Sequence, residues 1–200
     1  MAWNYGQEIH ALTGFEADST STTTSGETFV VHSNQWLTDS AKEVINMLPK
    51  RLLHLCASSQ TFTSGTPNAL NTGHILHVTR SDGTIEQPCR RIEANQKGRY
   101  SDSSDINLAT NTDPVFFIEN NSIEVLPSSG AVKYSEVQFP TVEHDDTAIA
   151  VFPDEAERAV VLGACIKASE YMLANDQDIE LIMPILAQLK DDYKKEIESL

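Results

Sequence analysis

The C-terminal quarter of the chain, residues 152–200, constrains the fold more than any other stretch. Pro153 suits the first position of a helix, because its missing N–H would be unpaired there. Acidic side chains follow within 154–157, where the positive end of the helix dipole favours them. A second series of apolar residues, at steps of three and four, begins at Ile179. The pattern predicts a helical hairpin with a break at residues 175–177.

The first of these helices carries a wide apolar arc that includes the small residues Gly163 and Ala164. So wide an arc predicts close packing against more than one neighbouring element. A bulky residue at either position is therefore expected to disrupt helix packing, at a cost of roughly 1–3 kcal/mol.

The second helix contains Pro184, which removes the amide hydrogen bond to Glu180 and clashes with that turn. The sequence therefore predicts either a kink or a break with a new helix starting there. Residues 190–200 are charged, and their apolar side chains lie only on the line Tyr193, Ile197 and Leu200. We expect this last segment to project from the body of the protein.

The N-terminal region predicts two helices separated by a polar stretch. Residues 1–15 space their apolar side chains by four and three, which indicates an amphipathic helix that docks either on its own core or on a neighbouring subunit. The Ser/Thr-rich residues 18–27 cannot bury apolar surface and predict a mobile loop or linker. A longer helix follows within 29–48 and stops at Pro49.

The start of this longer helix is open between Ser33, Asn34 and a capping box formed by Ser40 and Glu43. Its apolar residues recur at helical spacing and predict one buried face. That face comprises Leu37, Ala41, Val44, Ile45 and Leu48.

Between residues 52 and 139 the pattern changes to short β-rich runs bounded by turns. Asp82-Gly83 marks a hairpin, and the polar residues 95–112 predict a long loop. We expect an α+β fold, a helical bundle (N-terminal helices plus C-terminal helical hairpin) with an inserted small antiparallel β domain. Its predicted parts are residues 1–50, 51–142 and 143–200. The predicted strands are 53–56, 60–63, 74–80, 85–92, 115–118, 123–126 and 131–139.

Composition excludes several function classes. The net charge of −15 at pH 7 argues against a protein whose main function is to bind nucleic-acid phosphates. It favours a soluble, self-repelling surface. Cys56, Cys89 and Cys165 form no Cys-x-x-Cys pair, so neither a disulfide framework nor a zinc knuckle is expected. No apolar run predicts a signal peptide or a membrane span.

No stretch predicts a catalytic, cofactor or metal site, and we expect no enzyme. His74 and His77 would face opposite sides of a strand, which is poor metal geometry. The acidic turn 143–146 lacks the glycine and spacing of a calcium loop. Cys165 lies among apolar residues of a predicted helix and is expected to be an inert packed thiol.

One basic cluster stands out in this acidic chain. It consists of Arg90, Arg91, Lys97 and Arg99. Three interpretations are open: contact with phosphate, pairing with acidic residues of a neighbouring subunit or tail protein, and a solvated loop. The acidity of the chain favours acidic partners over phosphate, and a solvated loop is favoured over both.

Short stretches spread over most of the chain carry a resemblance to a known family. They are residues 2–5, 35–46, 75–80 with 82–84, 87–90, 113–115 and 152–157. These stretches resemble the head-to-tail adaptor (connector) proteins of tailed bacteriophages, notably the tail-tubular-A-like proteins of marine and freshwater phages. They are structural signatures and contain no catalytic motif.

The resemblance implies a structural virion protein of the phage neck, assembled in the host cytoplasm. Such adaptors form a homo-oligomeric ring, a dodecamer, below the portal protein and join the head to tail or nozzle proteins. An acidic bore would let double-stranded DNA pass without specific binding. The β-rich insertion would face the tail. The residues implied to contact the portal are Lys190, Asp191, Asp192, Tyr193, Lys194, Lys195, Glu196, Ile197, Glu198, Ser199 and Leu200.

Three other functions stay open as alternatives. A stopper or a tail terminator would share this chemistry but occupy another ring of the neck or tail. A small hydrolase would use scattered Ser, His and Asp residues. A stand-alone binding module would dock a partner on its helical hairpin and would form no ring.

Overall fold

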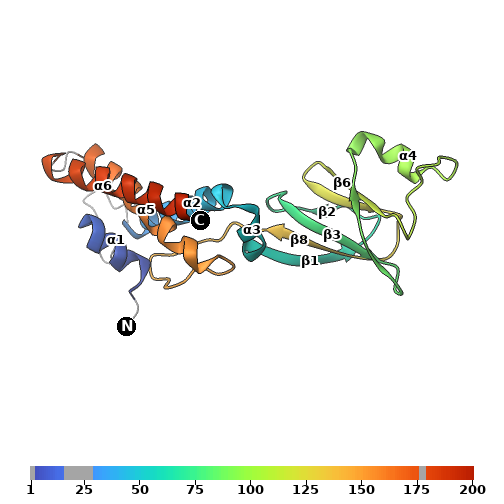
Figure 1. The fold of residues 1–200 in the computed structure, drawn as a ribbon, viewed down its shortest axis with the longest axis horizontal. Helices are drawn as coiled ribbons and strands as arrows, with labels where there is room; N and C mark the ends of the chain where they lie inside the picture. Colours follow the sequence, from blue (N-terminus) through green and yellow to red (C-terminus); the bar gives the residue numbers. More distant parts are fainter. Residues whose placement is uncertain (1–2, 16–28, 176–178) are drawn as a thin grey trace. The chain divides into compact units, whose positions relative to one another are not determined.

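The structure is a computed structural model that describes residues 3–15, 29–175 and 179–200. It has an α+β fold, which confirms the predicted fold class. The chain divides into two compact units. We call residues 1–56 with 139–200 the helical unit, and residues 57–138 the β unit (Figure 1). The predicted loop 18–27 lies outside the described residues.

The helical unit is organised around one central helix, α5. α1, α2 and α6 all pack against it, and α5 and α6 form the predicted hairpin (Figure 1). The middle of α5 is buried, as its small side chains predicted, because three neighbours cover it. The elements are α1 (Tyr5–Thr13), α2 (Phe29–Met47), α3 (Lys50–Leu53), the 3-10 helix η1 (His54–Cys56), α5 (Asp154–Ala174) and α6 (Ile179–Ser199).

Local chemistry sets the ends of the first helix. The Asn4 side chain accepts a hydrogen bond from the Gln7 amide at 2.8 Å, and the Gln7 side chain accepts one from the Asn4 amide at 3.2 Å. This reciprocal capping box pairs two amides that the helix itself leaves without partners. α1 ends at Gly14, whose φ of 73° is the left-handed conformation that glycine adopts without strain.

The predicted starts of α2 are wrong, although its predicted buried face is confirmed. The helix begins at Phe29, before both Ser33 and Asn34. Ser40 lies in the middle of the helix and is fully buried, so it caps nothing. Tertiary packing explains the difference, because α2 lies against α5 and burial there outweighs local capping preferences.

The alternative of a helix break at Pro184 is also wrong. α6 is one helix from Ile179 to Ser199 with Pro184 inside it. Ile182 and Leu186 are buried on either side of the proline, whereas Pro184 itself is exposed. Packing on both sides of Pro184 therefore holds the helix together despite the missing amide hydrogen bond.

The β unit consists of two four-stranded sheets with strand orders β1-β8-β3-β4 and β2-β7-β6-β5. Their pairs are antiparallel except β5 with β6, which is parallel and corrects the prediction of a purely antiparallel domain. The strands are β1 (Ala57–Thr63), β2 (Asn68–Ala69), β3 (Ile75–Ser81), β4 (Glu86–Pro88), β5 (Arg90–Arg91), β6 (Val115–Glu119), β7 (Ser122–Leu126) and β8 (Ala131–Val137).

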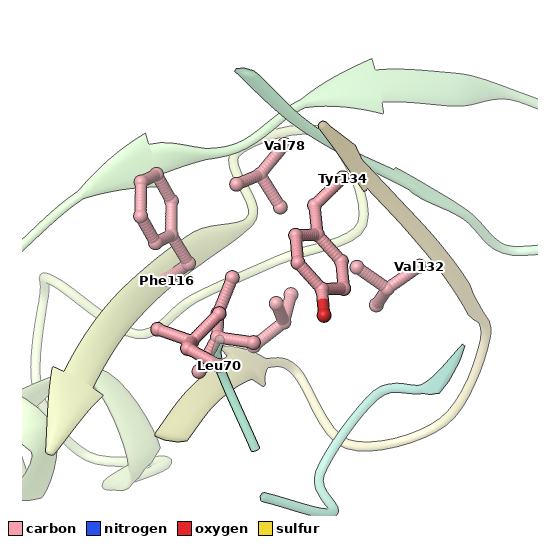
Figure 2. Packing of buried hydrophobic residues seen from close by; sticks show 7 residues of the cluster. Leu70, Val78, Phe116, Val132 and Tyr134 are labelled. Carbon is pink, nitrogen blue, oxygen red and sulfur yellow. The ribbon is translucent and has the colours of Figure 1, made fainter. Parts of the chain in front are cut away.

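Side chains from both sheets form the core of the β unit. Figure 2 shows the Tyr134 ring beside Val132, with Val78, Phe116 and Leu70 in the same cluster, which also includes Ile123 and Val125. The Tyr134 hydroxyl accepts a hydrogen bond from the Asn68 side chain at 2.9 Å, so its polar end is satisfied.

Two predicted segments of this region have a different structure. Residues 53–56 were expected to form a strand, but they lie in α3 and η1, where Leu52 and Cys56 are buried at helical spacing. The predicted loop 95–112 contains part of the 3-10 helix η2 (Ala94–Gln96) and the short helix α4 (Lys97–Ser101). The Asp82-Gly83 hairpin joins β3 to β4, as predicted.

Candidate interaction surfaces

The predicted basic cluster is largely neutralised within the β unit. The Arg90 guanidinium lies 2.9 Å from the Asp113 carboxylate and also donates to the Tyr100 hydroxyl. Both contacts raise the pKa of Arg90, because they favour its charged form. Arg91 is exposed, and within the described ranges it has no acidic partner.

The other two basic side chains are paired as well. The Lys97 ammonium lies 2.8 Å from the Glu124 carboxylate and 5.1 Å from the centre of the Phe117 ring. Arg99 lies 3.3 Å from Asp105. Three members of the cluster thus have acidic partners in their own chain. Partners on a neighbouring subunit or tail protein would have to displace them.

The C-terminal segment 190–200 does not project from the body, which corrects that prediction. Tyr193 is half-buried and lies close to Gly163 of α5. Glu196 pairs with Arg158 of α5 at 3.8 Å, and the Arg51 guanidinium donates to the carbonyl of Leu200. On the predicted apolar line, Tyr193 lies against α5, and Ile197 and Leu200 are partly buried.

The outward side of this segment carries ion pairs of its own. Lys195 pairs with Asp191 and lies 3.7 Å from Asp192, and Lys194 lies 3.8 Å from Glu198. The two partners of each pair lie about one helical turn apart and are largely solvent-exposed, so each pair contributes little to stability. The segment therefore presents a mixed-charge face formed by Asp191, Lys194, Lys195, Glu198 and Ser199.

The acidic turn 143–146 holds α1 in place. The carbonyl of His144 accepts a hydrogen bond from the Gly6 amide at 2.7 Å, and the carbonyl of Asp146 accepts one from the Tyr5 amide at 3.0 Å. The His144 amide donates to the Asn34 side chain of α2 at 2.8 Å. The backbone of this turn therefore links α1 to α2, while the side chains of Glu143 and Asp145 stay exposed.

The remaining candidates for chemistry show no assembled site. Burial raises the pKa of Cys56 to about 11 and that of Cys89 and Cys165 to about 12, so these free thiols stay protonated at neutral pH. Across residues 3–15, 29–175 and 179–200, no cluster of three His, Cys, Asp or Glu side chains could hold a metal ion. No helix in the same ranges is long and apolar enough to cross a membrane.

A groove between α1 and α5 is the surface that sequence reasoning missed. Its volume is about 300 Å³. Trp3 and Leu12 border it and remain 58% and 45% exposed. The groove is lined by Trp3, Glu8, Ala11, Leu12, Arg158, Val161 and Leu162, which makes it apolar with one acidic and one basic side chain. The predicted helical spacing included Trp3 and Leu12, but spacing alone did not show that α5 leaves them uncovered.

A second apolar surface lies at the start of α6. Ile179, Leu181 and Met183 are 60%, 64% and 51% exposed. Ile179 and Met183 are four residues apart and share one side of the helix, whereas Leu181 lies on the other flank of its buried face. We call the exposed side formed by Ile179, Glu180 and Met183 the α6 strip.

The pKa of the Glu8 carboxylate in the groove leads to a prediction about the stability of the fold. Burial, with repulsion from Glu157, raises the pKa of Glu8, and Arg158 offsets this only in part. A raised pKa in the folded state stabilises the fold below the unfolded pKa, and this contribution is lost as pH rises through the folded pKa. Glu8→Gln should therefore raise the thermal midpoint at pH 7, and the gain should disappear below pH 4.5.

The matched control is Glu119→Gln, which changes an exposed carboxylate on β6. Thermal unfolding of both variants and the wild type at the two pH values measures the effect. A midpoint for Glu8→Gln that is unchanged or lower at pH 7 contradicts the expected destabilisation by the charged carboxylate.

Comparison with protein-family models and with curated proteins found no match for this chain. The candidate surfaces are therefore defined by the geometry of the chain itself. Three of the four basic side chains are paired within the chain, and the inward side of the C-terminal half of α6 is packed. The groove and the apolar side chains of the α6 strip are left exposed by the residues that the structure describes, so these surfaces are the best suited to bind a protein.

Proposed function

We propose that this protein is a head-to-tail adaptor of a tailed bacteriophage, a structural virion protein of the neck without enzymatic activity. In this proposal it forms a ring, a dodecamer by the family resemblance, that joins the portal to the tail and lines the DNA passage. The observation that carries the proposal is the pair of uncovered apolar surfaces on the helical unit. Within residues 3–15, 29–175 and 179–200 nothing covers either surface, and an assembly would cover both.

The presence of two compact units supports different roles for them in the proposed assembly. In the proposal the helical unit is a bundle that forms the ring and contacts the portal, and the β unit is an insertion that faces tail or nozzle proteins. The acidic chain supports a bore that double-stranded DNA crosses without specific binding, because carboxylates repel phosphates. The three internally paired basic side chains agree with a surface that does not bind DNA tightly.

Because residues 190–200 pack on α5, substitution tests portal contact better than deletion does. Deleting this segment would expose the face of α5 that Tyr193 covers, so we expect the deletion to weaken the fold as well as portal attachment. Substitutions on the outward face avoid this problem. Lys194→Glu with Lys195→Glu should weaken binding to the portal protein while the ring and its thermal midpoint stay unchanged.

The control for portal contact is Lys133→Glu, which reverses an exposed charge on the β unit. Pull-down of the portal protein and light scattering on the same samples separate attachment from ring formation. If the Lys194→Glu, Lys195→Glu variant binds the portal protein as well as the wild type does, this face does not contact the portal.

Light scattering of the wild type, alone and with portal protein, tests the proposal as a whole. A ring that binds the portal is expected, and a monomer indifferent to the portal contradicts the adaptor function. Electron microscopy of particles then places the ring. A position away from the portal would instead favour the stopper or the tail terminator.

A further inference from the structure

The groove and the α6 strip cannot cover each other within one copy. α6 runs antiparallel to α5, because Lys190 pairs with Glu170 and Glu196 pairs with Arg158. The α6 strip therefore lies near the C-terminal end of α5, whereas the groove lies beside residues 158–162. The 12 steps from Leu162 to Ala174 correspond to about 18 Å along the helix axis.

The two surfaces are complementary in polarity and charge. Both offer large apolar side chains, and a tryptophan bordering a hollow is the kind of residue that contributes most to protein interfaces. Glu180 is exposed on the α6 strip. Arg158 is largely exposed at the groove, where it lies 3.8 Å from Glu196 and also attracts the Glu8 carboxylate. Two copies of a chain with a net charge of −15 repel each other. Apolar contact and an ion pair to one of the few cations would offset this repulsion.

We propose that the groove of one copy binds the α6 strip of the next copy. Ile179 and Met183 would lie against Trp3 and Leu12, and Glu180 would face Arg158. The contact joins two different surfaces, so an open row of copies keeps a free groove at one end and a free α6 strip at the other. Repetition of such a contact builds a ring when the rotation closes and a filament when it does not. This inference rests on the proposed ring function and assigns the contact that builds the ring.

Two single variants test the two sides of this contact. Trp3→Ser removes the aromatic border of the groove, and Met183→Glu places a charge in the α6 strip. Each change affects an exposed side chain, so the thermal midpoint should stay at the wild-type value. Each should weaken self-association by about tenfold or more, as at an interface hot spot. Leu181→Glu is the matched control, because it changes an equally exposed side chain on the other flank of α6.

Mixing the two variants tests the order of contact. A Met183→Glu copy keeps an intact groove, and a Trp3→Ser copy keeps an intact α6 strip. An equimolar mixture should form dimers that grow no further, whereas each variant alone should stay monomeric. Arg158→Glu should weaken assembly, and the double variant Arg158→Glu, Glu180→Arg should restore it. Light scattering and sedimentation measure all of these masses.

Four outcomes overturn the inference. If the wild type assembles and both single variants assemble equally well, the contact is elsewhere while the ring function stands. If only Trp3→Ser disrupts assembly, two grooves meet across a two-fold axis. If Leu181→Glu disrupts assembly as strongly as Met183→Glu, the α6 strip is assigned to the wrong side of the helix. A monomeric wild type overturns both this contact and the ring function.

Discussion

Replacing Gly163 with leucine should lower the thermal midpoint of the helical unit by roughly 4–12 °C. A Cβ atom at this position would lie 2.9 Å from Oγ and 3.0 Å from Cβ of Ser40 on α2, and 3.6 Å from the Tyr193 ring on α6. Ser40 is fully buried, so it has no room to move away. Overpacking of this kind costs roughly 1–3 kcal/mol, and each kcal/mol corresponds to a few degrees for a domain of this size.

Gly98→Leu is the matched control for the change at Gly163. Gly98 also lies in a helix, α4, but no atom stands within 4 Å of a Cβ built there. Thermal unfolding, with hydrogen exchange of the α5 amides to locate the effect, measures both variants. Equal midpoints for the two leucine variants would show that α2 and α6 yield to the added side chain.

Replacing Gly130 with alanine should destabilise the β unit strongly. Gly130 has a φ of 105°, and a Cβ there would lie 2.5 Å from the carbonyl oxygen of Ser81 and 3.1 Å from the Arg80 guanidinium. Arg80 is itself buried and donates to the carbonyl of Ser129, so neither neighbour is free to move. Backbone strain of roughly 1–3 kcal/mol and a comparable overpacking cost act together.

Gly83→Ala separates strain from overpacking. Its φ of 99° is similar, but no atom lies within 4 Å of the added Cβ. The loss of unfolding free energy should therefore be clearly larger for Gly130→Ala than for Gly83→Ala, measured by denaturant unfolding with hydrogen exchange of the β8 amides. Losses of equal size would mean that the close approach to Ser81 relaxes without cost.

Local sequence patterns predicted the candidate surfaces only in part. Helical spacing placed Tyr193, Ile197 and Leu200 on one line, but it could not tell whether solvent, a partner or α5 covered them. The basic residues Arg90, Lys97 and Arg99 were visible in the sequence. Their partners, by contrast, lie 23, 27 and 6 positions away, and residue type does not predict which acidic side chain folds beside which cation.

The sequence by itself determined the α+β class, the helical hairpin, the buried face of α2 and the Asp82-Gly83 hairpin. Each of these depends on hydrophobic periodicity or turn chemistry within a few neighbouring residues. Only the tertiary structure decided that α6 continues through Pro184 and that the C-terminal segment packs on α5. It also decided that a groove stays open beside Trp3. These features depend on burial against elements distant in the chain, which outweighs local preference.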